Sequence, residues 1–236
     1  MSGFRFSFPA CVIAGKGRIT ADDILMLRTY AFPDGIRSAE DARALLALND
    51  LCPASGPEWA GYFVESLAMF VVHRSEPAGM IDDANAAWLM RTIAADGVVR
   101  SAPELELLLH AMEIASEVPE SLSAFALDQL RLALGPEAQG AYRAGRPATE
   151  GINAHDLAYI WRVLRGAFER GRLMLSPSET LVLREIDRLA PRSAHHPAWS
   201  EMMAAVVTYE RPREILRTKR WLSIDDSHLL NDEMAA

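Results

Sequence analysis

Cysteine is scarce in this chain, since Cys11 and Cys52 are the only two among 236 residues. So few cysteines exclude the disulfide framework that holds many small secreted domains together. Cys52 follows an apolar helical pattern, and we expect it to be a buried small hydrophobe. A single disulfide between the two stays open, but a reduced, cytoplasmic setting is the simplest interpretation.

Long apolar runs are also missing. No stretch approaches the ~18 consecutive apolar residues that a membrane-spanning helix needs. The stretch Phe8–Gly15 is apolar but short, and it lacks the basic segment and long apolar core of a signal peptide. We therefore expect no membrane insertion, while peripheral association with a membrane stays open.

An excess of basic charge is absent as well, because the formal net charge is −8 and the isoelectric point is about 5.3. An acidic chain repels nucleic acid, so a nucleic-acid partner is not predicted. The densest basic cluster is Arg211–Arg220. We interpret it as the charged face of a terminal helix spanning Pro212–Leu222.

Patterns that carry common chemistry are not found. Gly15-Lys16-Gly17 lacks the spacing of a phosphate-binding loop, and no glycine pattern marks a nucleophilic serine. His195 and His196 are adjacent, whereas zinc-binding histidines on a helix stand three or four residues apart, so we place this pair in a loop. No catalytic residue and no cofactor are predicted.

What the chain does contain is a stretch that occurs twice, at Ile19–Met69 and again at Ile152–Tyr209. Three short segments align: Ile19-Thr20-Ala21-Asp22-Asp23-Ile24 with Ile152-Asn153-Ala154-His155-Asp156-Leu157, Leu48-Asn49-Asp50-Leu51-Cys52-Pro53 with Ile186-Asp187-Arg188-Leu189-Ala190-Pro191, and Pro57-Glu58-Trp59 with Pro197-Ala198-Trp199. Apolar residues recur with a helical period through both copies. The sequence therefore predicts an all-α, duplicated helical bundle of about ten helices.

Helix starts share one pattern at Ser38, Ser101 and Ser176, each followed three residues later by an acid. A serine at such a position accepts a hydrogen bond from the first helical turn, and the acid accepts one from the serine amide. We predict that each serine begins a helix. Each cap stabilises its helix by about 1 kcal/mol.

Breaks in the helical pattern divide the chain into five parts. The alternation of Phe4, Phe6 and Phe8 with polar residues suggests an extended arm, and Gly135–Gly151 is rich in Gly, Pro and Ala. The predicted parts are an N-terminal arm (1–18), a first helical unit (19–134), a linker (135–151), a second helical unit (152–222) and an acidic tail (223–236).

Four tryptophans, Trp59, Trp88, Trp161 and Trp199, fall at core positions of the expected helices. We interpret them as packing residues rather than ligand contacts. Trp59 and Trp199 align in the repeat, so we expect them to be buried at equivalent places.

Two turns support a family resemblance. Asp34-Gly35-Ile36-Arg37-Ser38-Ala39-Glu40-Asp41 and Asp96-Gly97-Val98-Val99-Arg100-Ser101-Ala102-Pro103-Glu104 resemble the helix–Asp-Gly–helix turn of tellurite-resistance TerB-like domains. The resemblance implies an all-helical bundle, a bacterial stress or envelope-associated process, and divalent-metal binding by acidic residues at these turns. Carried over, the metal-binding positions are Asp34, Asp41, Asp96 and Glu104. The second copy departs, because Gly171-Arg172-Leu173 stands where Asp-Gly is expected.

Taken with this resemblance, the sequence favours a non-enzymatic protein-interaction module with an unidentified protein partner. The alternative is a divalent-metal-binding sensor or buffer that uses the Asp-Gly turns, and an enzyme of unrecognised type is a third reading. Neither Asp-Gly turn offers the alternating acids of an EF-hand loop. Turn and cap roles explain the acids without a cation, so we expect no tightly bound metal.

Overall fold

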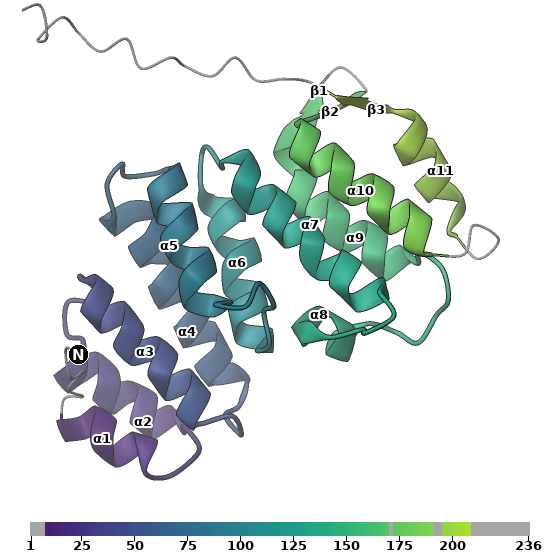
Figure 1. The fold of residues 1–236 in the computed structure, drawn as a ribbon. Coiled ribbons are helices and arrows are strands. Elements are labelled where there is room, and N and C mark those ends of the chain that lie inside the picture. The colour runs from purple at the N-terminus through teal and green to yellow at the C-terminus, as the bar shows by residue number, and fades with distance from the viewer. Residues whose placement is uncertain (1–7, 170–171, 191–194, 209–236) are drawn as a thin grey trace, which may run out of the picture.

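The computed structural model describes residues 8–169, 172–190 and 195–208 (Figure 1). The predicted terminal helix Pro212–Leu222 and the acidic tail 223–236 lie outside the described residues. Within these ranges the chain forms eleven α-helices: α1 (Phe8–Ala14), α2 (Ala21–Met26), α3 (Ala39–Leu51), α4 (Pro57–Met69), α5 (Asp83–Ile93), α6 (Ala102–Ile114), α7 (Glu120–Leu134), α8 (Gly140–Gly145), α9 (Ala154–Leu164), α10 (Pro177–Leu189) and α11 (Pro197–Ala204).

Shorter elements complete the fold: two π-helical turns, η1 (Leu27–Ala31) and η2 (Phe70–Arg74), a 3-10 turn, η3 (Arg165–Ala167), and the strands β1 (Phe168–Glu169), β2 (Arg172–Leu175) and β3 (Val206–Thr208). The predicted all-α class with about ten helices is confirmed. None of the described helices is long and apolar enough to cross a lipid bilayer.

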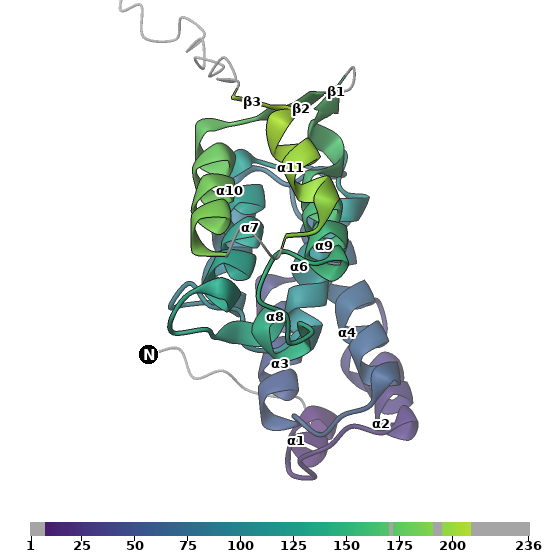
Figure 2. The same ribbon diagram turned by 90° about the vertical axis from the view of Figure 1, so that its right-hand side faces the viewer.

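The helices form an elongated bundle with α1–α4 at one end and α9–α11 at the other (Figures 1 and 2). In the first half α4 packs against α6, and in the second half α10 packs against α7. One hydrophobic core runs the whole length, from Ile13 to Trp199. Helix α7 contacts α5 as well as α9 and α10, so it joins the two ends.

The three serine-led helix starts are confirmed. Ser38 and Ser176 form reciprocal capping boxes with Asp41 and Glu179 at the starts of α3 and α10. Ser101 stands at the start of α6 but makes no side-chain cap, because its Oγ accepts a hydrogen bond from Asn49 Nδ2 at 3.0 Å. Here a contact between helices replaces the local contact that the pattern predicts.

The Asp-Gly turns depend on the conformational freedom of glycine. Gly35 has φ 75° before α3, and Gly97 has φ 84° before α6. Side chains with a Cβ rarely adopt this left-handed region, so glycine is the residue that suits both turns.

The tryptophans at the two ends of the bundle are buried as predicted, Trp59 with 2% and Trp199 with 1% of its surface exposed. Trp59 Nε1 donates to Asn49 Oδ1 at 3.1 Å, and Trp199 Nε1 donates to Asp187 Oδ1 at 2.8 Å. Asn49 and Asp187 are aligned in the repeat that the sequence predicts. The two indoles therefore share both their burial and the position of their hydrogen-bond partner.

The N-terminal part corrects the expectation of an extended arm. Residues Phe8–Ala14 form helix α1, in which Ala10 and Ile13 are buried against the core. These two residues stand three apart, which is a helical spacing. The alternating phenylalanines that suggested an extended segment lie mostly at positions 1–7, outside the described residues.

The expected linker 135–151 also holds more structure than predicted. It contains helix α8 (Gly140–Gly145), and both Tyr142 and Arg146 are buried. Their partner is Asp156, which stands beyond the linker, so the pattern within the linker gave no indication of their burial.

A small sheet was not expected at all. Strand β2 pairs antiparallel with β1 and parallel with β3, and Leu173 and Leu175 on β2 are buried. The repeat predicts a central helix over Pro197–Tyr209, but α11 ends at Ala204 and Val206–Thr208 forms β3 instead. The sheet thus occupies the part of the second half where the Asp-Gly turn is missing.

Candidate functional site

An apolar groove of about 480 Å³ lies between α9, α11 and the β1–β2 hairpin. Of the described residues that line it, ten are apolar and one is charged: Leu157, Ala158, Ile160, Trp161, Leu164, Phe168, Leu173, Ala198, Met202 and Ala205, with Glu201. We refer to this surface as the α9–α11 groove. Its composition suits an apolar ligand surface rather than a polar substrate.

Two aromatic side chains stand at this groove and are largely exposed, Trp161 to 58% and Phe168 to 42%. Their ring centroids are 5.4 Å apart with the planes tilted by 57°, so each ring supports the other. The sequence predicts that Trp161 lies in the core, and this prediction is wrong because the side chain is 58% exposed. The apolar face of α9 is wider than the surface that the neighbouring helices cover. Trp161 lies at the edge of that face, where none of the described helices covers it.

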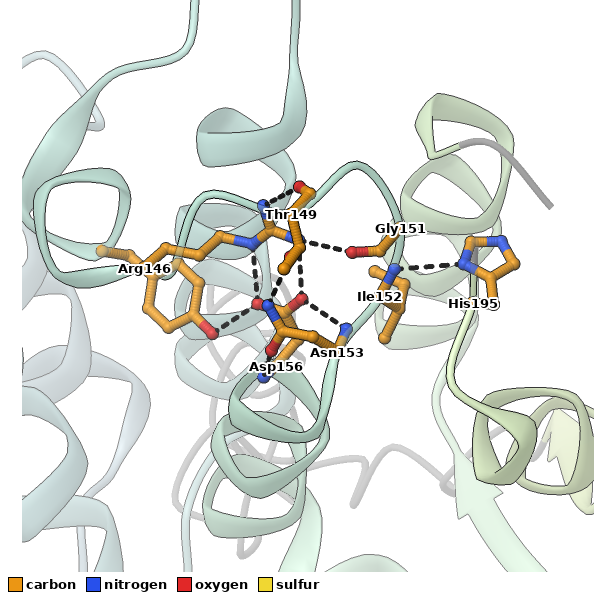
Figure 3. Close-up of polar contacts among 8 residues, drawn as sticks. Arg146, Thr149, Gly151, Ile152, Asn153, Asp156 and His195 are labelled. Atoms are coloured by element: carbon orange, nitrogen blue, oxygen red, sulfur yellow. Dashed lines mark hydrogen bonds and ion pairs between the residues drawn. The ribbon is translucent and has the colours of Figure 1, made fainter. Parts of the chain in front are cut away.

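The start of α9 is held by a buried polar cluster (Figure 3). Asn153 caps the helix, and its amide donates to Asp156 Oδ2 at 2.9 Å. Arg146 binds Asp156 with two hydrogen bonds, Nε to Oδ1 at 2.9 Å and Nη2 to Oδ2 at 2.8 Å. The same guanidinium donates to the carbonyls of Thr149 and Gly151.

This cluster is almost fully removed from water, since the side chains of Arg146 and Asp156 are 2% and 0% exposed. The Tyr142 hydroxyl donates to Asp156 Oδ1 at 2.8 Å. Burial and the neighbouring carboxylate raise the pKa of Tyr142, so its hydroxyl stays protonated and keeps donating. The cluster fixes the position of α9 and, through it, of Trp161.

The opposite wall of the groove is fixed by a second set of contacts. His196 caps α11, and Trp199 in its first turn is anchored to Asp187 on α10. His195 Nδ1 accepts a hydrogen bond from the Ile152 amide at 3.2 Å (Figure 3). That contact joins the segment before α11 to the segment before α9, so the two groove walls are tied together.

The neighbouring histidines lie just before α11, in the loop that the sequence predicts. The His195 ring is 6% exposed, and its Nε2 is 3.9 Å from Asp187 Oδ1. Among the described residues this Nε2 has no hydrogen-bond partner. Because Nδ1 accepts a bond, the neutral ring carries its proton on Nε2.

The acids at the first Asp-Gly turn make local contacts. Asp34 pairs with Arg37 at 3.2 Å at the surface. Asp41 Oδ2 accepts from the amides of Ser38 at 3.0 Å and Arg37 at 3.1 Å. Turn and cap contacts therefore account for both residues.

The acids at the second turn lie in different environments. Asp96 is exposed and pairs with Arg100, whose hydrogen bond, together with that of the Val98 amide, lowers the pKa of Asp96. Glu104 is 7% exposed, and burial together with the charge of Asp50 raises its pKa to about 7. Over the residues that the structure describes, no three His, Cys, Asp or Glu side chains converge as a metal site would require.

Glu104 lines a second cavity of about 400 Å³ between α3, α4 and the start of α6. Asn49 and Trp59, already joined by a hydrogen bond, form part of its wall. The family resemblance gave Glu104 as a metal-binding position in the alternative interpretation. The structure places its side chain in the cavity between α3, α4 and the start of α6, where it is 7% exposed.

A third cavity of about 570 Å³ lies between α6, α7, α9 and α10. At its edge Arg162 binds Glu106 at 2.7 Å and Glu113 at 2.6 Å, and Ser123 binds Glu179 inside it. The hydrogen bond from Arg162 lowers the pKa of Glu113. Arg162 on α9 thus neutralises Glu106 and Glu113 on α6, and these ion pairs connect the two helices.

Comparison of the chain with protein-family models, with curated proteins and with solved structures finds no match.

Proposed function

We propose that this protein is a non-enzymatic protein-interaction module and that the α9–α11 groove is its binding surface. The observation that carries the proposal is the exposed pair of Trp161 and Phe168 at a groove lined by apolar side chains. Aromatic residues that are exposed beside an apolar groove are typical of surfaces that bind a partner's apolar side chains.

The walls of the groove are held in place before any partner arrives. The buried pair of Arg146 and Asp156 fixes α9, and the hydrogen bond from Ile152 to His195 ties α9 to the segment before α11. A preorganised surface loses less conformational entropy on binding than a mobile one. The partner we infer presents an apolar helix face, as helix-in-groove complexes do.

We further propose that the two ends of the bundle arose by duplication of a TerB-like unit. Three correspondences support this. Thr20 and Asn153 each form a capping box at the first helix of their end. The Ile19 amide donates to Ser55 and the Ile152 amide donates to His195, two residues before Pro57 and Pro197, and each buried indole donates to the preceding helix. The resemblance of the Asp-Gly turns supports a role in a bacterial stress or envelope-associated process, and the scarcity of cysteine supports a cytoplasmic setting.

The test is affinity capture from a native bacterial lysate with three versions of the chain. Trp161→Ser removes the exposed indole of the groove, and Tyr30→Ser removes another exposed aromatic ring, 70% exposed on η1 at the far end. Circular dichroism establishes that all three are folded. We expect the wild type and Tyr30→Ser to retain the same protein, and Trp161→Ser to retain at least about tenfold less, as for a binding hot spot.

Equal retention of every captured protein by all three versions contradicts the groove as the binding surface. Loss of retention by Tyr30→Ser alone moves the surface to the first half of the bundle.

A further inference from the structure

The α9–α11 groove lies beside the point where the chain leaves the described structure. Ala205 and Leu173 line the groove, and Leu173 pairs with Val206 in the sheet. Strand β3 ends at Thr208, three residues after Ala205. The described chain therefore ends three residues after a residue of this apolar surface, and 28 residues follow in the sequence.

The sequence of these residues contains apolar side chains that suit the groove. Three apolar residues, Trp221, Leu222 and Ile224, fall within four positions of the sequence, and Lys219 and Arg220 come immediately before them. The groove offers aromatic rings and the flexible thioether of Met202, which adapts to irregular apolar surfaces.

Charge favours the same pairing. Five of the chain's 24 lysines and arginines and six of its 32 aspartates and glutamates lie beyond Thr208, so residues 1–208 carry a formal charge of −7. All five basic residues fall within Arg211–Arg220, just before the three apolar residues. Among the described residues that line the groove, Glu201 is the charged one, and it is opposite in sign to Lys219 and Arg220.

The segment is also long enough. Twelve residues separate Thr208 from Trp221, and they span up to about 40 Å when extended. Helix α9, which forms one whole wall of the groove, is 11 residues and therefore about 16 Å long. Trp221 can thus reach any part of the groove.

We propose that the segment 209–236 of the same chain occupies the α9–α11 groove through Trp221, Leu222 and Ile224, and so competes with the partner. A short tether gives such a segment an effective concentration on the order of millimolar, so modest intrinsic affinity suffices to fill the groove. This regulation of partner binding rests on the proposed function, whereas occupancy of the groove is testable without any partner.

The experiment uses the full chain with p-benzoyl-L-phenylalanine, a photoreactive amino acid, in place of Phe168 at the groove. The matched control carries it in place of Tyr30, an exposed aromatic position on η1. The purified protein is irradiated at low concentration, and cross-linked peptides are identified by mass spectrometry. We expect position 168 to cross-link to a peptide from 209–236 at the mass of a single chain, and position 30 not to do so.

A second variant tests the proposed contact. The variant is Trp221→Asp, at a position outside the described residues. We expect it to lower the cross-link yield at position 168 about tenfold, because one apolar aromatic contact with the groove is lost. Cross-links at position 168 only to a second copy, or none to 209–236, overturn the proposal. Lysate capture that depends on Trp161 would then still support the partner-binding function, so the two failures are distinguishable.

Discussion

The two ends of the bundle, α2–α4 and α9–α11, share a polar framework and differ in how they are covered. In each, a capped first helix leads to a buried tryptophan that is hydrogen-bonded to the helix before it. At the α2–α4 end, helix α4 is 13 residues long and packs against α6, and Tyr62 and Phe63 lie beside Trp59. In the second end α11 is only eight residues long and the chain turns into β3.

That difference explains where the exposed surface lies. At the first end the longer α4 packs against α6 and buries Trp59, Tyr62 and Phe63, while Tyr30 and Leu51 on neighbouring elements stay exposed. The shorter α11 leaves one edge of α9 open, and Trp161 stands at that edge. The two ends thus share their buried tryptophans, and the second end adds the apolar α9–α11 groove that we propose as a binding surface.

Core truncation at the two tryptophans gives the largest expected effect. Trp59→Ala and Trp199→Ala should each lower the free energy of unfolding by about 3–5 kcal/mol, the usual cost of removing a large core side chain. Chemical denaturation of each variant provides the measurement, with Trp161→Ala as the exposed control. A cost at Trp199 no larger than at Trp161 would show that the second end is not packed like the first.

The buried acids at the two capped helices should differ. Asp156 faces Arg146, whose side chain is 2% exposed, whereas Asp23 faces Lys16, whose side chain is 47% exposed. Asp156→Asn leaves a buried cation without its counter-ion and should cost about 3–5 kcal/mol. Asp23→Asn should cost about 1 kcal/mol, because Lys16 can return to water.

Denaturation curves for both asparagine variants under one buffer condition measure that difference. Equal losses would contradict the view that the exposure of the cationic partner sets the cost of replacing the acid. Since Arg146 fixes the start of α9, Arg146→Met should also weaken partner capture, whereas Lys16→Met should not.

Much of this framework follows from sequence patterns because it is local. The caps at Ser38 and Ser176 need only residues three positions apart, and the burial of Trp59 and Trp199 follows from helical periodicity. Local patterns also give the all-α class and the approximate number of helices.

The missed features depend on contacts between distant residues. Tyr142 and Arg146 are buried because Asp156 receives them, and β2 forms with β3 more than thirty residues later. Whether Trp161 is covered depends on where α11 ends. No periodicity within α9 contains that information, so the groove could not be found from the sequence.

Glu104 occupies the third position of α6, as Glu179 does in α10, and burial together with the charge of Asp50 raises the pKa of Glu104 from 4.5 to about 7. The folded state then binds a proton that the unfolded state releases, so this residue makes stability fall as pH rises from about 4.5 to 7. Glu104→Gln should therefore raise the free energy of unfolding at pH 8 by on the order of 2–3 kcal/mol.

The measurement is denaturation of the wild type and Glu104→Gln at pH 5 and pH 8, with Glu179→Gln as the control. Glu179 accepts bonds from the Ser176 amide and from Ser123, so its replacement should destabilise the fold at both pH values. A Glu104→Gln variant that is less stable than the wild type at pH 8 refutes the account of this acid.

Metal should have the smallest effect at either end. Arginine and backbone contacts already satisfy Asp34, Asp41 and Asp96. We expect the melting temperature to stay the same with EDTA and with millimolar calcium or magnesium. A metal present at about a hundred times its dissociation constant would stabilise the fold by roughly 2.7 kcal/mol. An upward shift that Asp34→Asn or Asp96→Asn abolishes would favour the metal-binding alternative.

The most direct test of the central claim is fluorine NMR of the chain labelled with 5-fluorotryptophan, with the Trp161 signal assigned from a Trp161→Phe variant. The captured partner is added to the labelled chain. Binding in the α9–α11 groove predicts that the Trp161 resonance shifts while those of the buried Trp59 and Trp199 stay in place. A Trp161 resonance that does not move while the partner is bound contradicts the groove as the site of interaction.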